Sequence, residues 1–485
     1  MMDANKPETI EGRDREWSLL DGFVGDARPG NRLAVLYGRR RQGKTMLLEA
    51  LAEVHGSLYW EAAQQSRAQN LASFSDTWST FARSPGPIRF ATWEQALDTV
   101  LAAADPGRSV LFDEVGYLVD TAPEFPSLLQ RHFGPRLERS GTTKVVICGS
   151  VYAQMTRLLA ADAPLRGRHS LVLDVAPFDV VSAARFWGLA SNPDAAFRMH
   201  ALIGGTPAYR RFAGDRVPRN GNVDAWVVRH LLDMASPLFN EGTLLVADDP
   251  TLADKSLYWS VLSAIADGNR RRNDIASALD RSPGSLAQPI DVLLAGQWIE
   301  QRTDPFHPRY SLMQLTEPML RTHRVVIAPE RRRLAQGRAD AVWTDVQGRV
   351  ARLIYGPHLE WVANDWIMRT EPIDVVGVRP TDSGPGTLRF DKTANQIDIV
   401  TIAPGRNDAL LIHAVGEVKA DGKAMGISQL ERLDQIVARL DDRAADTVRR
   451  VLVARKGFTA ELAREARRRG DTSLVGLDRI YNPGR

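Results

Sequence analysis

One motif constrains the fold of this chain more than any other feature: residues 38–45, GRRRQGKT, fit the pattern GxxxxGK[ST]. An apolar run from Leu33 to Tyr37 precedes the motif and predicts a buried strand, and helical apolar spacing from Met46 to Val54 follows it. Strand, loop and helix in this order form a phosphate-binding loop, because backbone N–H groups and the positive end of the helix surround the anion. The motif therefore predicts an α/β domain that binds a nucleotide.

Each position of the motif has an expected role. Gly38 and Gly43 let the backbone turn so that its N–H groups point at the phosphate, Lys44 would reach the β- and γ-phosphates, and Thr45 would be a ligand of Mg²⁺. The expected cofactors are ATP and Mg²⁺. The expected cofactor-binding residues of the loop are Gly38, Arg39, Arg40, Arg41, Gln42, Gly43, Lys44 and Thr45.

A second motif, SVLFDE at residues 109–114, is an apolar strand that ends in two carboxylates. Asp113 would hold Mg²⁺ through water, and Glu114 would polarise the attacking water. An acidic pair after a strand is more often a helix N-cap, but its combination with the phosphate-binding loop favours catalysis. A further core strand, KVVICGS, ends at Ser150, which would lie beside the loop and sense the γ-phosphate. Strands that alternate with helices predict a parallel sheet covered on both faces.

A short turn, PLRGR at residues 164–168, carries two arginines. Arg166 or Arg168 could act as an arginine finger on the transferring phosphate, supplied by a neighbouring copy of the chain. Ordinary surface arginines explain the turn equally well. A homo-oligomer is therefore a possible state of the protein.

Several short motifs occur in a familiar order: GRRRxGKT, FDE, CGS, PLxGR, PF and GGTPAY. Together they resemble the archaeal-type ATPases, a branch of the AAA and signal-transducing (STAND) ATPases, over residues 10 to about 240. The resemblance implies a P-loop ATPase core at residues 1–175 and a helical lid at residues 176–248.

Residues 249–330 have the pattern of a winged helix. Amphipathic spacing predicts a first helix around Val261, a second helix at 273–279, a third at 285–294, and a β-hairpin that starts near Gly296 and returns at 309–312. The outer face of the third helix would carry Ser285, Gln288 and Asp291. Basic residues around it would meet DNA phosphates: Arg270, Arg271, Arg272, Arg281, Arg302 and Arg309. DNA is the expected partner, and a protein partner bound through the winged helix is the alternative.

The last predicted domain, residues 341–485, begins after a charged connector at 331–340. A helix at 356–368 carries Glu360, and two strands, 395–401 and 410–419, flank a polar turn. If that turn centres on Asn407 and Asp408, Asp398 lies opposite Glu417, and Lys419 shares their face of the sheet. A slip of one residue would separate them.

This arrangement resembles the core of PD-(D/E)XK nucleases, which also occurs behind a winged helix in some archaeal-type ATPases. The resemblance implies that Asp398, Glu417 and Glu360 hold Mg²⁺ and that Lys419 orients or deprotonates the attacking water. The expected catalytic residues are thus Glu114, Asp398, Glu417 and Lys419. Three functions stay open: an ATP-dependent DNA nuclease, a nucleotide-switched DNA-binding regulator without nuclease turnover, and an ATPase that acts on a protein partner.

Composition sets the remaining limits. The 485 residues are 44% apolar and 25% charged with a net charge of +3, so the chain is globular and any DNA-binding face is local. The single cysteine, Cys148, excludes intramolecular disulfides and zinc sites built on cysteines, and it fits a reducing compartment. The first ten residues lack the features of a signal peptide, and no apolar run approaches 18 residues. We expect a cytoplasmic protein of α/β class: a parallel P-loop sheet, a helical lid, a winged helix and a C-terminal α/β domain of the restriction-endonuclease type.

Overall fold

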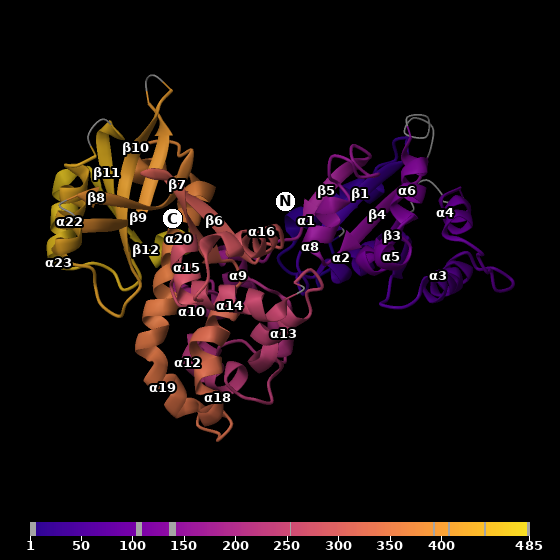
Figure 1. The fold of residues 1–485 in the computed structure, drawn as a ribbon, viewed down its shortest axis with the longest axis horizontal. Helices are drawn as coiled ribbons and strands as arrows, with labels where there is room; N and C mark the ends of the chain where they lie inside the picture. Colours follow the sequence, from indigo (N-terminus) through magenta and orange to yellow (C-terminus); the bar gives the residue numbers. More distant parts are fainter. Residues whose placement is uncertain are drawn as a thin grey trace. The chain divides into compact units, whose positions relative to one another are not determined.

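A computed structural model describes residues 6–102, 109–134, 142–252, 254–390, 393–405, 408–440 and 443–482. The chain divides into two compact units (Figure 1). The first contains Met1–Pro177 and the short segment Thr206–Ala208; the second contains Phe178–Gly205 and Tyr209–Arg485.

The first unit is built on a five-stranded parallel sheet. Its spatial order is β2 (Leu58–Glu61), β3 (Ser109–Asp113), β4 (Lys144–Gly149), β1 (Arg32–Tyr37) and β5 (His169–Asp174). Because parallel strands end at the same edge of a sheet, the phosphate-binding loop, the acidic pair and Ser150 all follow strands at one carboxyl edge. The predicted α/β class with a parallel P-loop sheet is confirmed.

Helices cover both faces of this sheet. They are α1 (Asp14–Gly25), α2 (Lys44–His55), α3 (Arg67–Phe81), α4 (Trp93–Ala102), α5 (Val115–Thr121), α6 (Phe125–Gln130) and α8 (Tyr152–Arg157), with a short 3₁₀ turn η1 (Arg131–Phe133). Side chains of β1 alternate between two cores: Leu33 and Val35 join one cluster, whereas Ala34 and Leu36 join the other. This two-sided burial explains why the strand reads as a continuous apolar run.

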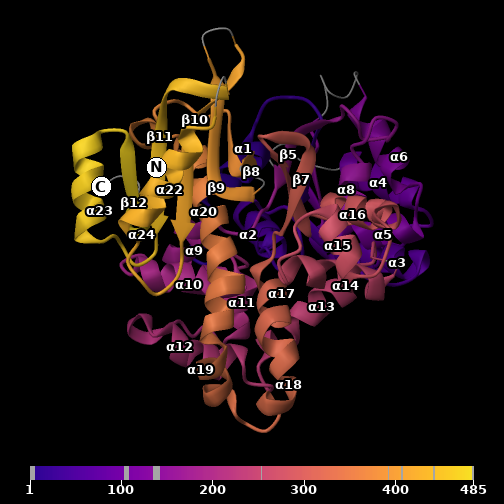
Figure 2. The same ribbon diagram turned by 60° about the vertical axis from the view of Figure 1, so that its left-hand side comes forward.

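The second unit begins with a helical region. It comprises α9 (Val180–Phe186), α10 (Pro193–Ile203), α11 (Ala208–Phe212, whose first residue belongs to the first unit), η2 (Arg219–Gly221), α12 (Val223–Trp226), η3 (Val227–Leu231), η4 (Pro237–Asn240) and α13 (Glu241–Ala247). Later helices join it: α17 (Pro318–Thr322), η6 (His323–Ile327), α18 (Ala328–Leu334), α19 (Ala339–Val350), η7 (Ala351–Tyr355) and α20 (Gly356–Thr370). Residues 331–340, expected to be a connector, form the end of α18 and the turn into α19, and these two helices lie side by side (Figure 2).

Three helices and a hairpin lie between these helical regions in the chain. They are α14 (Lys255–Ala266), α15 (Arg272–Ala278), the 3₁₀ turn η5 (Pro283–Leu286) with α16 (Ala287–Ala295), and the antiparallel strands β6 (Ile299–Asp304) and β7 (His307–Leu315). Val261, Ile275 and Ile290 from the three helices meet in one apolar core. The observed elements have the order and, within a few residues, the bounds predicted from the sequence.

A five-stranded mixed sheet completes the second unit. Its order is β12 (Thr472–Gly476), β11 (Ala444–Ala454), β10 (Leu410–Lys419), β9 (Thr393–Pro404) and β8 (Asp382–Phe390), with β8, β9 and β10 antiparallel and β10, β11 and β12 parallel. One face of the sheet packs against α20, and the other packs against α22 (Ile427–Val437). The short helices α21 (Ile373–Val376) and α24 (Leu477–Tyr481), together with α23 (Ala460–Arg469), complete the fold.

The register of β9 and β10 shows how the two strands align the predicted residues. Near the loop, Leu410 pairs with Pro404 and Ile412 with Ile402, one residue away from the register that we predicted from a turn at Asn407 and Asp408. Asn407 lies outside the described residues. A bulge between Ile412 and Ala414 then shifts the pairing by one residue, so that Gly416 pairs with Ile399. Continued by one residue, this register places Glu417 opposite Asp398, as predicted.

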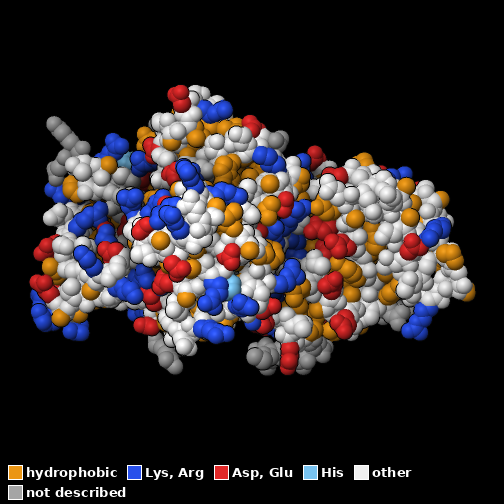
Figure 3. Space-filling view, turned by 90° about the horizontal axis from the view of Figure 1, so that it is seen from below, with side chains coloured by type: hydrophobic (Ala, Val, Ile, Leu, Met, Phe, Trp, Pro, Cys, Tyr) orange, Lys and Arg blue, Asp and Glu red, His pale blue; other side chains and the backbone are white. Residues whose placement is uncertain are grey.

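No helix in the described part of the chain is both long and apolar enough to cross a membrane. On the face drawn in Figure 3, Lys and Arg side chains gather in several clusters with Asp and Glu between them. This mixed surface agrees with the small net charge of +3.

Candidate functional site

The phosphate-binding loop has a backbone that requires glycine at its first position. Gly38 has φ +153°, and a Cβ atom there would lie 2.5 Å from the carbonyl oxygen of Val175. Gly43 has φ +86° and precedes the first residue of α2, and Arg41 also has positive φ, +74°. Lys44 is buried, and its Nζ donates hydrogen bonds of 2.9 Å to the carbonyl oxygens of Gly38 and Arg39. The loop therefore wraps around the lysine amine, the geometry that a phosphate group needs.

Oxygen atoms of the type that could hold a metal lie at the end of β3. The hydroxyl of Thr45 donates a 2.8 Å hydrogen bond to Oδ2 of Asp113, and the hydroxyl of Tyr59 donates a 3.2 Å bond to the same oxygen. The backbone N–H of Glu114 donates to Oδ1 of Asp113 at 2.8 Å. A hydroxyl and a carboxylate in contact are the oxygen donors that Mg²⁺ prefers, so this pair fits the metal expected from the sequence.

Glu114 occupies a strained position at the same edge. Its φ is +48°, which is rare for a residue with a side chain, and it directly precedes α5. The hydroxyl of Ser150, at the end of β4, donates a 2.8 Å hydrogen bond to Oε2 of Glu114. The structure thus brings together Glu114 and Ser150, which were predicted separately, and the observed partner of Ser150 is this carboxylate.

Negative charge accumulates around these groups. Burial, followed by the charges of Asp113, Glu114 and Glu49, raises the pKa of Glu61 at the end of β2. Burial and the charge of Asp113 also raise the pKa of Tyr59, which keeps this hydroxyl protonated as a donor. An excess of carboxylates beside an anion-binding loop favours a divalent cation between them.

The other loop residues contact protein groups. Arg40 donates a 2.5 Å hydrogen bond to the hydroxyl of Tyr117. The side chain of Gln42 is buried and donates a 3.1 Å bond to the hydroxyl of Thr206, while the backbone carbonyl oxygen of Gln42 accepts a 3.0 Å bond from Arg13. Gln42 was predicted among the nucleotide contacts; in the structure its side chain joins the loop to the Thr206 segment.

The two candidate finger arginines differ in their surroundings. Arg166 is exposed, whereas Arg168 is half-buried and donates a 3.4 Å hydrogen bond to the carbonyl oxygen of Phe133. An exposed guanidinium is the one that a neighbouring copy can approach, so this difference favours Arg166 as the finger.

The second constellation lies on the C-terminal sheet. Asp398 and Glu417 are 9% and 6% exposed, and Nζ of Lys419 lies 2.6 Å from Oε1 of Glu417. Oδ2 of Asp398 accepts a 2.9 Å hydrogen bond from the backbone N–H of Val418. Burial, and then the charges of Glu360 and Glu417, raises the pKa of Asp398 well above its usual value. The structure therefore brings all four predicted residues near one another.

Arginines occupy part of this constellation. Glu417 also forms an ion pair with Arg432 of α22, and Glu360 forms a 3.1 Å ion pair with Arg270. Within the described residues, no group of three or more His, Cys, Asp or Glu side chains has the arrangement of a metal site. The oxygen donors fit a divalent cation by their chemistry, and the cation would have to displace these arginines to bind all of them.

Asn364 is a buried polar residue beside this constellation that the sequence analysis missed. Its side chain is 2% exposed and donates hydrogen bonds to the carbonyl oxygens of Glu360 and Asp398, at 2.9 and 3.0 Å. It also accepts a 2.8 Å bond from the hydroxyl of Ser383. The side chain thereby joins α20 to β8 and β9. A polar residue one helical turn after Glu360, on an otherwise apolar face, is the signal that could have identified it.

Some of the basic residues predicted around the third helix are bonded to other protein groups, and others are exposed. Arg271 donates a 3.0 Å hydrogen bond to the hydroxyl of Thr387, and Arg302 donates a 2.7 Å bond to the carbonyl oxygen of Ser383. Other predicted contacts are exposed, as the hypothesis requires: Arg272, Arg281, Ser285, Gln288 and Asp291. The side chain of Arg309 lies outside the described set.

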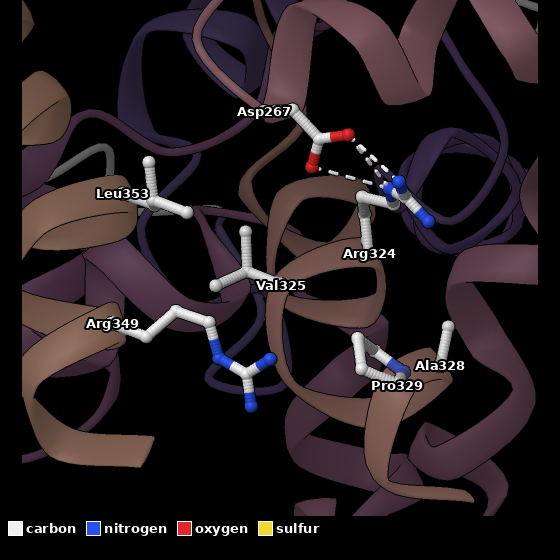
Figure 4. Close-up of a pocket in the computed structure, with 7 residues that line it drawn as sticks. All are labelled: Asp267, Arg324, Val325, Ala328, Pro329, Arg349 and Leu353. Carbon is white, nitrogen blue, oxygen red and sulfur yellow. Dashed lines mark hydrogen bonds and ion pairs between the residues drawn. The ribbon is translucent and has the colours of Figure 1, made fainter.

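A cavity of about 440 Å³ lies elsewhere in the second unit (Figure 4). Its charged lining residues have protein partners: Arg324 bonds to both carboxylate oxygens of Asp267 at 2.7–3.2 Å, and Arg349 donates to Glu330 at 2.7 Å. The remaining lining side chains are Val325, Ala328, Pro329 and Leu353. This cavity contains none of the predicted site residues.

Residues 14–207 match the family described as an ATPase domain predominantly from Archaea. The chain carries an archaeal-type ATPase domain. An uncharacterized protein of Methanocaldococcus jannaschii is 25% identical over 272 residues, which cover 56% of this chain and 57% of that protein. The chain thus spans a little over half the length of this curated relative.

One solved structure extends the similarity of fold beyond the ATPase domain. The Walker-type ATPase PABY2304 of Pyrococcus abyssi superposes with a TM-score of 0.51 at 19% identity, over 67% of this chain and 99% of that chain. The ORC2 protein of Aeropyrum pernix, solved as ADPNP-ADP complexes, gives a TM-score of 0.43 at 12% identity over 72% of this chain and 98% of that chain. The first comparison shows that the shared fold reaches past residue 207, because 67% of this chain is more than the ATPase domain contains.

Proposed function

We propose that this protein binds and hydrolyses ATP with Mg²⁺ in its first unit and acts on DNA through its second unit. The observation that carries the ATPase part is the 2.8 Å contact between Thr45 and Asp113 at the carboxyl edge of the sheet. This contact joins the phosphate-binding loop to the acidic strand, the two elements that a P-loop ATPase uses to hold its metal.

The residues of the first unit have distinct roles in this proposal. The loop backbone and Lys44 bind the phosphates, and Thr45 and Asp113 hold Mg²⁺, which neutralises charge on the phosphates when bound. Glu114 orients the attacking water and accepts its proton. Ser150 holds the Glu114 carboxylate, and Arg166 of a neighbouring copy approaches the γ-phosphate in a homo-oligomer.

For the second unit we propose Mg²⁺-dependent hydrolysis of DNA phosphodiester bonds, controlled by the nucleotide state. Asp398, Glu417 and Glu360 would hold the metal, and Lys419 would orient the attacking water. This proposal is supported by the register of β9 and β10, which gathers the carboxylates and the lysine on one face. Residues 249–330 would bind DNA as a winged helix, supported by the exposed face of α16 and the exposed Arg272 and Arg281.

A specific observation favours a second candidate, a nucleotide-switched regulator that binds DNA without cutting it. Glu360 and Glu417 already have arginine partners, and the described residues contain no ready metal site. If the arginines stay in place, the same residues would stabilise the sheet and add positive charge for DNA phosphates. A protein partner bound by α16 is the third possibility, and steep salt dependence of DNA binding would argue against it.

The test is cleavage of labelled linear, branched and supercoiled DNA with Mg²⁺ or Mn²⁺, with and without ATP. Wild type is compared with Lys419→Ala and with Lys44→Ala. We expect cleavage by wild type, no cleavage by Lys419→Ala, and a response to ATP that Lys44→Ala removes. If no substrate is cut while ATP is hydrolysed and DNA is bound in a nucleotide-dependent way, the regulator replaces the nuclease.

A further inference from the structure

Two roles assigned from the sequence compete in the second unit. Arg270 was expected to meet a DNA phosphate, and Glu360 was expected to hold a metal. In the structure the guanidinium of Arg270 lies 3.1 Å from Oε2 of Glu360, and both side chains are about one-fifth exposed. While this ion pair exists, Arg270 is not available to a phosphate, and the Glu360 oxygen is not available to a cation.

The position of Arg270 connects it to the surface expected to meet DNA. It is the first of three consecutive arginines, and Arg272, the first residue of α15, is exposed. Arg271 is fixed to Thr387 by a 3.0 Å hydrogen bond. A phosphate that binds at Arg272 would therefore arrive within two residues of Arg270. A phosphate can replace Glu360 as its partner, because arginine binds phosphate and carboxylate with the same planar donors.

The ion pair lies in surroundings that make it easy to exchange. Arg321 of α17 is buried and lies close enough to both Arg270 and Glu360 to interact with their charges. Repulsion between the two arginines weakens the hold of Glu360 on Arg270. After Arg270 leaves, Arg321 still offsets part of the charge of Glu360.

We propose that Arg270 is a latch on the C-terminal metal site: its ion pair with Glu360 keeps a divalent cation out until a DNA phosphate draws the guanidinium away. This inference rests on the nuclease proposal, because it assumes that Glu360 belongs to a metal site. The latch couples metal binding to DNA binding, so that the site does not bind the metal in the absence of substrate.

The test is a calorimetric titration of the full chain with Mn²⁺ and no nucleotide, in an Asp113→Asn background that removes the metal site of the first unit. Removal of an ion pair that is partly shielded from solvent should tighten Mn²⁺ binding about two- to fivefold in Arg270→Gln. Arg270→Lys keeps the charge but loses the planar donors and should give an intermediate affinity. Arg352→Gln removes an exposed arginine two turns before Glu360 and is the matched control, with no expected change.

The possible outcomes distinguish the proposed role of Arg270 from the existence of the C-terminal metal site. Tighter binding in Arg270→Gln that disappears when Asp398→Asn is added supports the latch. Equal Mn²⁺ affinity in wild type and Arg270→Gln, both dependent on Asp398, overturns the latch and leaves the metal site standing. Absence of Asp398-dependent binding in every variant overturns the metal site itself and the latch with it.

Discussion

A buried pair of histidines should make the second unit sensitive to mild acid. His200 of α10 and His358 of α20 lie in a hydrogen bond, with Nδ1 of the first 2.9 Å from Nε2 of the second, and both are at most 5% exposed. Burial lowers the pKa of His200 from 6.5 to about 4, and burial followed by the charge of His200 lowers the pKa of His358 well below its usual value. Both rings are therefore neutral in the folded state at pH 7.

The magnitude follows from the two pKa values of His200. Because its pKa is lower in the folded state, the unfolded chain takes up a proton first as the pH falls below 6.5. The stability that the neutral ring provides is fully present above pH 6.5 and is lost as the pH falls toward 4. At pH 5 this histidine alone lowers the free energy of unfolding by about 2 kcal/mol relative to pH 7.5, or about 30-fold in the opening equilibrium.

Hydrogen exchange followed by mass spectrometry measures this effect on peptides from α10 and α20 at pH 7.5 and 5.0, after correction for intrinsic exchange. We expect wild type to lose at least about 30-fold in protection between the two values, because His358 adds to the effect of His200, and we expect the loss in His200→Asn to be about 30-fold smaller than in wild type. His307→Asn, which removes a half-buried histidine of β7, is the control and should behave as wild type does. Equal losses in wild type and His200→Asn would refute the argument that burial keeps this ring neutral.

Three further predictions follow from single contacts. Tyr59→Phe removes one hydrogen bond to Asp113, the carboxylate proposed to hold Mg²⁺, and should weaken the Mg²⁺ affinity of the nucleotide complex about 2- to 13-fold, measured by titrating ATP hydrolysis with Mg²⁺. Gly38→Ala places a methyl group against the Val175 carbonyl and should abolish binding of a fluorescent ATP analogue, whereas Gly22→Ala, whose methyl group meets no neighbouring atom, should bind normally. Asn364→Ala removes the buried side-chain hydrogen bonds that join α20 to β8 and β9 and should lower the stability of the second unit by about 1–3 kcal/mol in urea unfolding; an unchanged midpoint would contradict this.

The sequence predicted the central strands of the first unit well, because strands buried on both faces are long apolar runs. It did not predict β5, whose sequence HSLVLD has an apolar run of only three residues and follows a turn rich in arginine and glycine. This strand lies at the edge of the sheet, so only some of its side chains are buried and its pattern is weak.

The strand β8 was missed for a related reason. Its sequence, DSGPGTLRF, contains Pro385 between two glycines, a composition typical of a turn. In the structure β8 is an edge strand, and its register shifts between Gly384 and Gly386, so the proline lies where no ladder hydrogen bond is needed. Tertiary pairing with β9 therefore overrides the local preference.

The partners of the site residues were harder to predict than the residues themselves. Motif spacing placed Lys44, Asp113, Asp398 and Glu417 because each follows or lies in a strand of regular period. The contacts of Glu360 with Arg270 and of Gln42 with Thr206 join residues 90 and 164 positions apart, and such pairing depends on how helices pack. No local pattern encodes it.

The central claim is that the carboxyl edge of the first sheet is a catalytic ATP site. The most direct test measures ATP binding and steady-state ATP hydrolysis, with and without duplex DNA, for wild type, Glu114→Gln and Lys44→Ala. The account predicts that Glu114→Gln binds ATP but hydrolyses it at least about 100-fold more slowly, and that Lys44→Ala binds ATP poorly. Hydrolysis by Glu114→Gln at the wild-type rate would contradict it.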